Sequence, residues 1–168
     1  KGGGERRRHF LNQVLGQTNP RYAQDLKAYD RAVAQRNRLF FLSRLGEAVR
    51  EEDFLAWEEQ LARFSVSLLT QRFRFLPFLE QKAQLYWLDW LGQTKPIAIR
   101  YGASWGKGDS LPTVEAFQRL FQVSRESEMK RGQTLIGPHR DDFEICLAGH
   151  PVRETASQGE QRLLAFLL

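Results

Sequence analysis

The chain has 168 residues, of which 42% are hydrophobic and 27% charged, with a formal net charge of +5. This balance is ordinary for a globular protein with a buried core. No run of about 18 apolar residues occurs, so we expect no membrane partner or span. The lone cysteine, Cys146, excludes an internal disulfide framework and a cysteine-cluster zinc site, and it favours a cytoplasmic location. The positive charge is compatible with nucleic acid but is not evidence for it.

The first half of the chain predicts helices. Residues 5–15 form a short amphipathic helix that Asn19-Pro20 ends. From Arg21 onward, apolar residues recur at spacings of three and four. Arg36 occupies the one position of this row that is not apolar. The members of this first row are Tyr22, Leu26, Tyr29, Val33 and Phe40.

A second apolar row follows a polar connection that contains Gly46 and the acidic residues 51–53. Its members are Phe54, Trp57, Leu61, Phe64, Leu68 and Phe75. Two such rows joined by a short polar segment predict an antiparallel helical hairpin. Pro77 should kink or end its second helix, and a helical pattern resumes over residues 78–91.

Beyond Gly92 the pattern changes. We expect a strand over 96–101, a loop over 102–112 and a helix from Thr113 to about Lys130. Residues 143–147 and 152–156 predict a β-hairpin, and a last helix opens at Ser157. The predicted fold class is mainly α with a small β element (α+β). Residues 1–92 are expected to form one part of the chain and residues 93–168 another.

Ser157-Gln158-Gly159-Glu160-Gln161-Arg162 lies between the second hairpin strand and an apolar helix. The first helical turn leaves backbone N–H groups unpaired at a positive dipole end, which favours phosphate. Gly159 would let a ligand approach the backbone closely. The alternative is a simple capping box, in which Ser157 and Glu160 satisfy each other's backbone N–H groups.

The same hexapeptide resembles the signature motif of ABC-type ATPases in the form found in the RecF family. Gly137-Pro138-His139-Arg140-Asp141-Asp142 is similar to the block that precedes this motif in RecF proteins, and it is the more specific of the two. Residues 5–11 resemble the family's transition from ATPase head to helical arm, and residues 29–37 resemble its first arm helix. The order and spacing of these four segments match those of the family, so the resemblance extends over nearly the whole chain.

The resemblance implies an antiparallel helical arm over 1–92 and the signature-motif lobe of an ABC-type head over 93–168. It implies a parent ATPase of DNA recombination, repair, replication and the SOS response that binds ATP, magnesium and DNA. It also implies RecO and RecR as partners, and a homodimer that closes around two ATP molecules. In that dimer Ser157 and Gly159 would contact the γ-phosphate bound by the partner subunit, with Gln161 supporting the loop.

The chain departs from a complete ATPase because it has no G-x-x-x-x-G-K-[ST] loop and no apolar strand ending in acids. We therefore expect no ATP hydrolysis and no bound cofactor for the chain alone. The apolar run at residues 163–168 agrees with an internal part of a longer protein.

Arginines are candidates for contact with DNA phosphates, the alternative being that they lie on solvated helix faces. The candidate DNA-binding set is Arg6, Arg7, Arg8, Arg36, Arg38, Arg72 and Arg74, with Arg21 and Arg31 as further candidates. His139, Asp141 and Asp142 could suggest a metal, but adjacent acids on a strand point to opposite faces. We expect no metal site, and instead a structural turn in which Arg140 pairs with an aspartate.

A rival interpretation belongs to a different class. The chain would be a helical protein-interaction module with no nucleotide role, and its Ser-x-Gly-x-Gln sequence would be only a helix cap.

Overall fold

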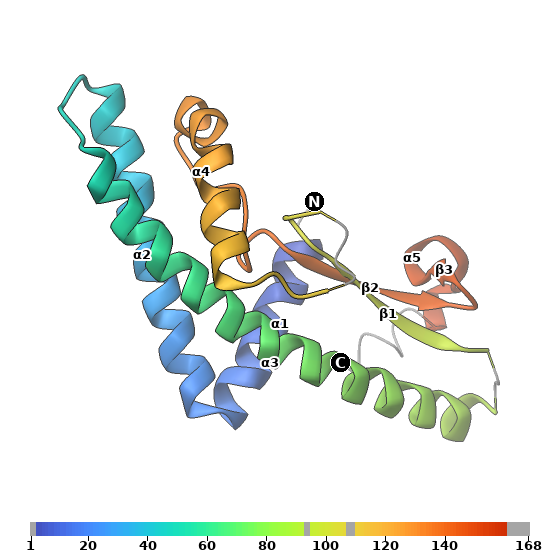
Figure 1. Ribbon diagram of the computed structural model, residues 1–168. Coiled ribbons are helices and arrows are strands. Elements are labelled where there is room, and N and C mark those ends of the chain that lie inside the picture. The colour runs from blue at the N-terminus through green and yellow to red at the C-terminus, as the bar shows by residue number, and fades with distance from the viewer. Residues whose placement is uncertain (1–2, 93–94, 107–109, 161–168) are drawn as a thin grey trace.

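The computed structural model describes residues 3–92, 95–106 and 110–160 (Figure 1). The helices are α1 (Gly3–Thr18), α2 (Pro20–Arg44), α3 (Glu51–Leu91), α4 (Val114–Arg131) and α5 (Val152–Thr155). The strands are β1 (Ile97–Gly102), β2 (Asp142–Leu147) and β3 (His150–Pro151). None of the helices within these ranges combines the length and apolar character that a membrane crossing requires.

Helices α2 and α3 form an antiparallel hairpin that projects from the rest of the molecule (Figure 1). Asn19 starts α2, because its side-chain oxygen accepts the backbone N–H groups of the first turn. Tyr29 and Leu61 are fully buried, and Val33 and Phe64 are partly buried in the same core. The two apolar rows of the sequence therefore do face the interior of a helical hairpin.

Helix α3 does not end at Pro77 but continues to Leu91. The expectation of a helix end was wrong, because buried side chains on both sides of Pro77 hold the helix in place: Leu76, Leu79, Ala83 and Trp87. These contacts offset the hydrogen bond that proline cannot donate. The helix stops at Gly92, whose φ of +61° is a left-handed conformation that glycine adopts without strain.

The sheet has the order β1-β2-β3 and is antiparallel throughout. Strand β1 pairs with β2 from Ile97 opposite Leu147 to Gly102 opposite Asp142. On the outer edge of β1, the backbone N–H groups of Ile97 and Ile99 donate to side chains of α3, namely Gln84 (2.7 Å) and Glu80 (2.6 Å). The sheet is thus attached to the long helix through its edge.

The predicted second hairpin strand over 152–156 is wrong. Strand β3 has only two residues, and Val152–Thr155 is a helical turn. Pro151 explains the difference, since it has no N–H group to continue the ladder.

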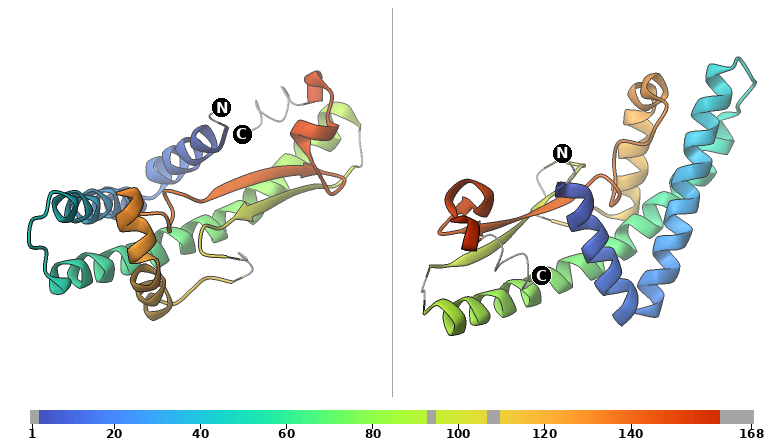
Figure 2. Two further views of the ribbon diagram at one scale, coloured as in Figure 1. Left: turned by 90° about the horizontal axis from the view of Figure 1, so that it is seen from above. Right: turned by 180° about the vertical axis from the view of Figure 1, so that it is seen from behind.

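One hydrophobic core joins the hairpin to the later elements. Its buried side chains come from α1, α2, α3, α4 and β2, and include Leu11, Tyr29, Leu68, Phe117 and Phe143. Figure 2 shows α1 running from the sheet to the base of the hairpin, with α4 beside the hairpin's free end. The architecture is mainly helical with a small antiparallel sheet, which confirms the predicted fold class.

Replacing Leu61 with alanine should lower the free energy of unfolding by about 2–5 kcal/mol, because this side chain is fully buried between the hairpin helices. Leu55 of the same helix is 39% exposed, so Leu55→Ala is the matched control and should cost far less. Urea denaturation of both variants checks this, and equal losses would contradict the packing described.

Candidate functional site

The candidate nucleotide-facing loop begins at Ser157. The Ser157 hydroxyl oxygen accepts the backbone N–H of Glu160 at 3.2 Å, and the Ser157 N–H donates to the Glu160 carboxylate at 2.7 Å. This is a reciprocal capping box. The local geometry expected for a helix cap is therefore present.

The surface of this loop is open. Ser157, Gln158 and Gly159 are exposed. Among the described residues, a Cβ added at Gly159 would meet only the Ser157 hydroxyl oxygen, 4.0 Å away. Lys95 lies 3.8 Å from the Glu160 carboxylate. The Ser157 backbone N–H holds the pKa of Glu160 below its usual range, and Ser157's side chain and Lys95 act in the same direction. Gln161, the third predicted site residue, lies outside the described residues.

The hexapeptide 137–142 contacts a buried arginine, Arg72 of α3, through Pro138. Its guanidinium donates to the Pro138 carbonyl oxygen (2.8 Å), the Tyr101 hydroxyl (3.0 Å), the Tyr22 hydroxyl (3.1 Å) and Asn12 (2.9 Å). We call this set the Arg72 network. It ties α1, α2, α3 and β1 to the turn that leads into β2.

The two aspartates of the hexapeptide have separate partners. Asp141 accepts the Tyr101 hydroxyl (2.8 Å) and the Ser104 backbone N–H (2.7 Å), and burial raises its pKa. Asp142 pairs with Arg7 of α1, at 2.6 and 3.0 Å. The predicted pairing of Arg140 with an aspartate was wrong, since Arg140 donates to the Thr134 carbonyl and to Gln133.

No cluster of metal-ligand side chains occurs within the described ranges.

His139 is held as one neutral tautomer. Its Nε2 atom lies 3.1 Å from the Thr134 carbonyl oxygen, which can only accept, so Nε2 carries the proton. In the neutral ring Nδ1 then accepts the Tyr29 hydroxyl at 2.6 Å. Burial lowers the pKa of His139 to about 4. Gly137 has a φ of +123°, and a Cβ there would overlap the Tyr29 hydroxyl. Glycine is therefore required for this turn to approach α2.

A second buried charge group joins α2, α3 and α4. Arg36 is fully buried and pairs with Glu58 (3.0 Å) and Glu128 (2.7 Å), and it also donates to Thr134. Arg125 of α4 pairs with Glu58 at 2.6 Å. In this Arg36 network two guanidinium groups balance two buried carboxylates, and the exposed Glu51 also lies 3.3 Å from Arg125. The network locks α4 against the hairpin.

These networks correct two members of the candidate DNA-binding set. Arg36 and Arg72 are 0% and 1% exposed and use their donors inside the protein, so neither can reach a phosphate. Arg7 is committed to Asp142, and Arg8 donates to the Asp141 carbonyl. The exposed members stay expectations and lie on three different helices: Arg6, Arg38 and Arg74.

Sequence reasoning missed the acids Glu58 and Glu128. The sequence does carry one indication of them, because Arg36 stands where the apolar row should have an apolar residue. A charge that faces a core requires a buried partner of opposite charge.

Curated relatives resemble the chain in sequence over nearly its whole length. The chain is 36% identical over 165 residues to the DNA replication and repair protein RecF of Herpetosiphon aurantiacus, covering 96% of the chain and 41% of that protein. It is 34% identical over 169 residues to the RecF protein of Geobacillus kaustophilus, covering 99% of the chain and 45% of the relative. The chain thus spans less than half the length of these relatives. No profile of a known protein family matches it.

A solved structure of the recombination mediator protein RecF with ATP, in the RecFOR pathway, superposes on 99% of the chain with a TM-score of 0.87 and 26% identity. The match covers 45% of that structure's chain. These findings confirm the resemblance indicated by the motifs: over the length it spans, the chain is RecF-like in sequence and in fold.

Replacing Arg36 with methionine should lower the free energy of unfolding by about 3–5 kcal/mol, because Glu58 and Glu128 keep their burial but lose a cation. Arg38→Met is the matched control at an exposed position of the same helix, and its effect should stay within about 0.5 kcal/mol. Chemical denaturation compares the two, and similar losses would contradict the buried role of Arg36.

Stability should fall as pH drops from about 7 to 5. The pKa of His139 is about 4 in the folded chain but 6.5 in the unfolded chain. Between these values the unfolded chain binds a proton that the folded chain does not, so acid favours unfolding. Denaturation midpoints at several pH values measure this slope. A His139→Gln variant should show a shallower slope over the same interval, and an unchanged slope would contradict a buried neutral histidine.

Proposed function

We propose that this chain forms the helical arm (1–92) and the signature-motif lobe (93–168) of a RecF-like DNA-repair ATPase. Ser157 and Gly159 would contact the γ-phosphate of an ATP molecule bound by a second subunit, with Gln161 supporting the loop. The observation that carries the proposal is the exposed helix start at Ser157, on a chain that is RecF-like over nearly its whole length.

The geometry of the loop suits an incoming phosphate. The first helical turn leaves backbone N–H groups without partners in the helix, and its dipole favours an anion. Ser157 can still donate its hydroxyl hydrogen, because only its oxygen lone pair serves the cap. Gly159 keeps the surface free of a Cβ. The carboxylate of Glu160 opposes an anion, and nearby Lys95 partly offsets it.

The rest of the activity belongs to the complete parent protein. The sequence contains no phosphate-cradling G-x-x-x-x-G-K-[ST] loop, so ATP and magnesium would be held by other segments of the parent. DNA, RecO, RecR and a second copy of the parent are the proposed partners, and the cytoplasm is the proposed location. A structural relative is named as a recombination mediator of the RecFOR pathway, which supports this assignment.

The rival function is a helical interaction module whose Ser157 is only a cap, and the observed capping box favours it locally. Aspartate at an N-cap position is as good as serine. It would, however, place a negative charge where the γ-phosphate is expected. The change Ser157→Asp therefore separates the two functions.

In a complete parent protein, Ser157→Asp should leave folding and ATP binding by the altered subunit nearly unchanged. ATP-dependent association should weaken at least about tenfold, since a charge-assisted hydrogen bond worth about 1.5–3 kcal/mol is replaced by repulsion. Sedimentation with and without ATP measures this. Ser157→Arg places a long side chain in the space where the two subunits would meet, and it should give the same loss. Normal association by folded Ser157→Asp protein would favour the cap alone.

A further inference from the structure

The second half of α3 is apolar on more than its buried side. Ala83 and Trp87 are buried and pack with Ile97 and Leu147 of the sheet. The rest of its circumference carries large apolar side chains that are 44–52% exposed, and we call this set the α3 face: Phe78, Leu85, Tyr86, Leu88 and Trp90. A helix that is apolar nearly all round is normally buried nearly all round, so a partner for this face is expected.

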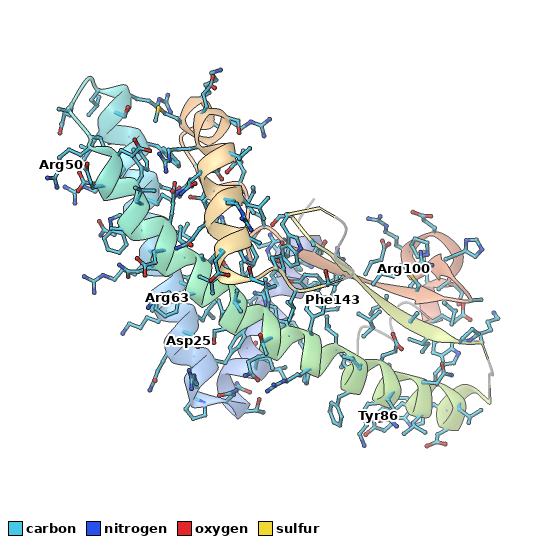
Figure 3. All side chains as sticks on the ribbon, viewed as in Figure 1. Asp25, Arg50, Arg63, Tyr86, Arg100 and Phe143 are labelled. Atoms are coloured by element: carbon cyan, nitrogen blue, oxygen red, sulfur yellow. The ribbon has the colours of Figure 1, made fainter. Side chains whose placement is uncertain are left out.

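The α3 face is accessible to a second molecule. Figure 3 shows Tyr86 projecting from the side of α3 that is turned away from β1 and β2. In Figure 1 this half of α3 forms an outer edge of the molecule, and no described helix or strand runs along that edge. The rings of Tyr86 and Trp90 lie with their centroids 5.8 Å apart, so they form one continuous aromatic surface.

Two opposite charges flank the middle of the α3 face. Lys82 lies one turn before Leu85 and Asp89 one turn after it, and both are exposed. The Lys82 ammonium lies 5.5 Å from the centroid of the Phe78 ring, and no ion pair among the described residues includes Lys82 or Asp89. Along the helix axis, each charge lies about 5 Å from the midpoint between Leu85 and Tyr86.

This placement of the charges is self-complementary. If a second copy of the helix lies antiparallel across the face, each Lys82 meets the other copy's Asp89, and each Leu85 meets the other copy's Tyr86. A parallel arrangement would instead place like charges together. Because one lysine and one aspartate cancel, the face favours neither an acidic nor a basic partner, and two copies meet there without local repulsion.

We propose that the α3 faces of two copies of the chain pair antiparallel in a two-fold symmetric contact. Leu85 and Tyr86 lie at its centre, and a Lys82–Asp89 ion pair lies on either side. The contact uses no nucleotide and no residue of the Ser157 loop, so it goes beyond the proposed function and does not depend on it. It spans only about 18 Å of helix, so we expect weak association, on the order of micromolar.

The test is sedimentation velocity of the chain without nucleotide, from about 1 μM to about 200 μM, the range in which a small interface associates. The weight-average sedimentation coefficient should rise with concentration toward that of a dimer. Leu85→Glu places a carboxylate at the centre of the contact and should weaken association at least about tenfold. Leu45→Glu is the matched control, because Leu45 is 61% exposed at the free end of the hairpin, and it should change association less than about twofold.

Charge exchange tests the antiparallel arrangement. In Lys82→Asp two acids meet on each side of the pair, and in Asp89→Lys two bases meet, so each variant alone should associate at least about fivefold more weakly. An equimolar mixture of these two variants should recover most of the association, because opposite charges meet again in the mixed pair. The double variant Lys82→Asp/Asp89→Lys should associate as the unaltered chain does. Circular dichroism melting confirms that each variant is folded.

Three results would overturn the proposal. A sedimentation coefficient that stays that of a monomer over the whole range would assign the α3 face to another segment of a longer parent or to a different protein. An equal loss in Leu45→Glu would show general apolar attraction without a defined contact. A mixture of the two charge variants that associates no better than either variant alone would exclude the antiparallel pairing.

Discussion

The arrangement of this molecule depends on the burial of the Arg72 guanidinium. A charge removed from water is costly unless hydrogen bonds replace its hydration, and here four groups from separate segments do so. Those groups can meet only when the hairpin, α1 and the sheet hold their observed positions. One side chain therefore sets the relative placement of elements that are distant in sequence.

The same interaction reaches the candidate functional loop. Arg72 holds the Pro138 carbonyl, and the chain passes from there into β2, the two-residue β3 and α5 before it reaches Ser157. Glu160 adds a contact to Lys95, two residues before β1. The loop is thus linked through the sheet to the base of the hairpin.

Much of the fold could be read from the sequence because its signals are local. The apolar rows and the caps at Asn19 and Thr113 depend on neighbours within a few residues. The capping box at Ser157 does too, which is why its geometry could be predicted but its phosphate role stays a proposal. The roles of Arg36 and Arg72 could not be predicted in this way, since their partners lie up to 98 residues away. Exposed and buried arginines look alike until those partners are known.

The edges of the small sheet have a consequence for how the protein behaves at high concentration. An open strand edge invites pairing with the strand of another molecule, a route to aggregation. On β1 the side chains of Gln84 and Glu80 accept the outward N–H groups of Ile97 and Ile99, and β3 ends at a proline that cannot donate. An intruding strand would have to displace a carboxylate and an amide held by a long helix. These contacts therefore disfavour the addition of a further strand at the outer edge of β1 and at β3.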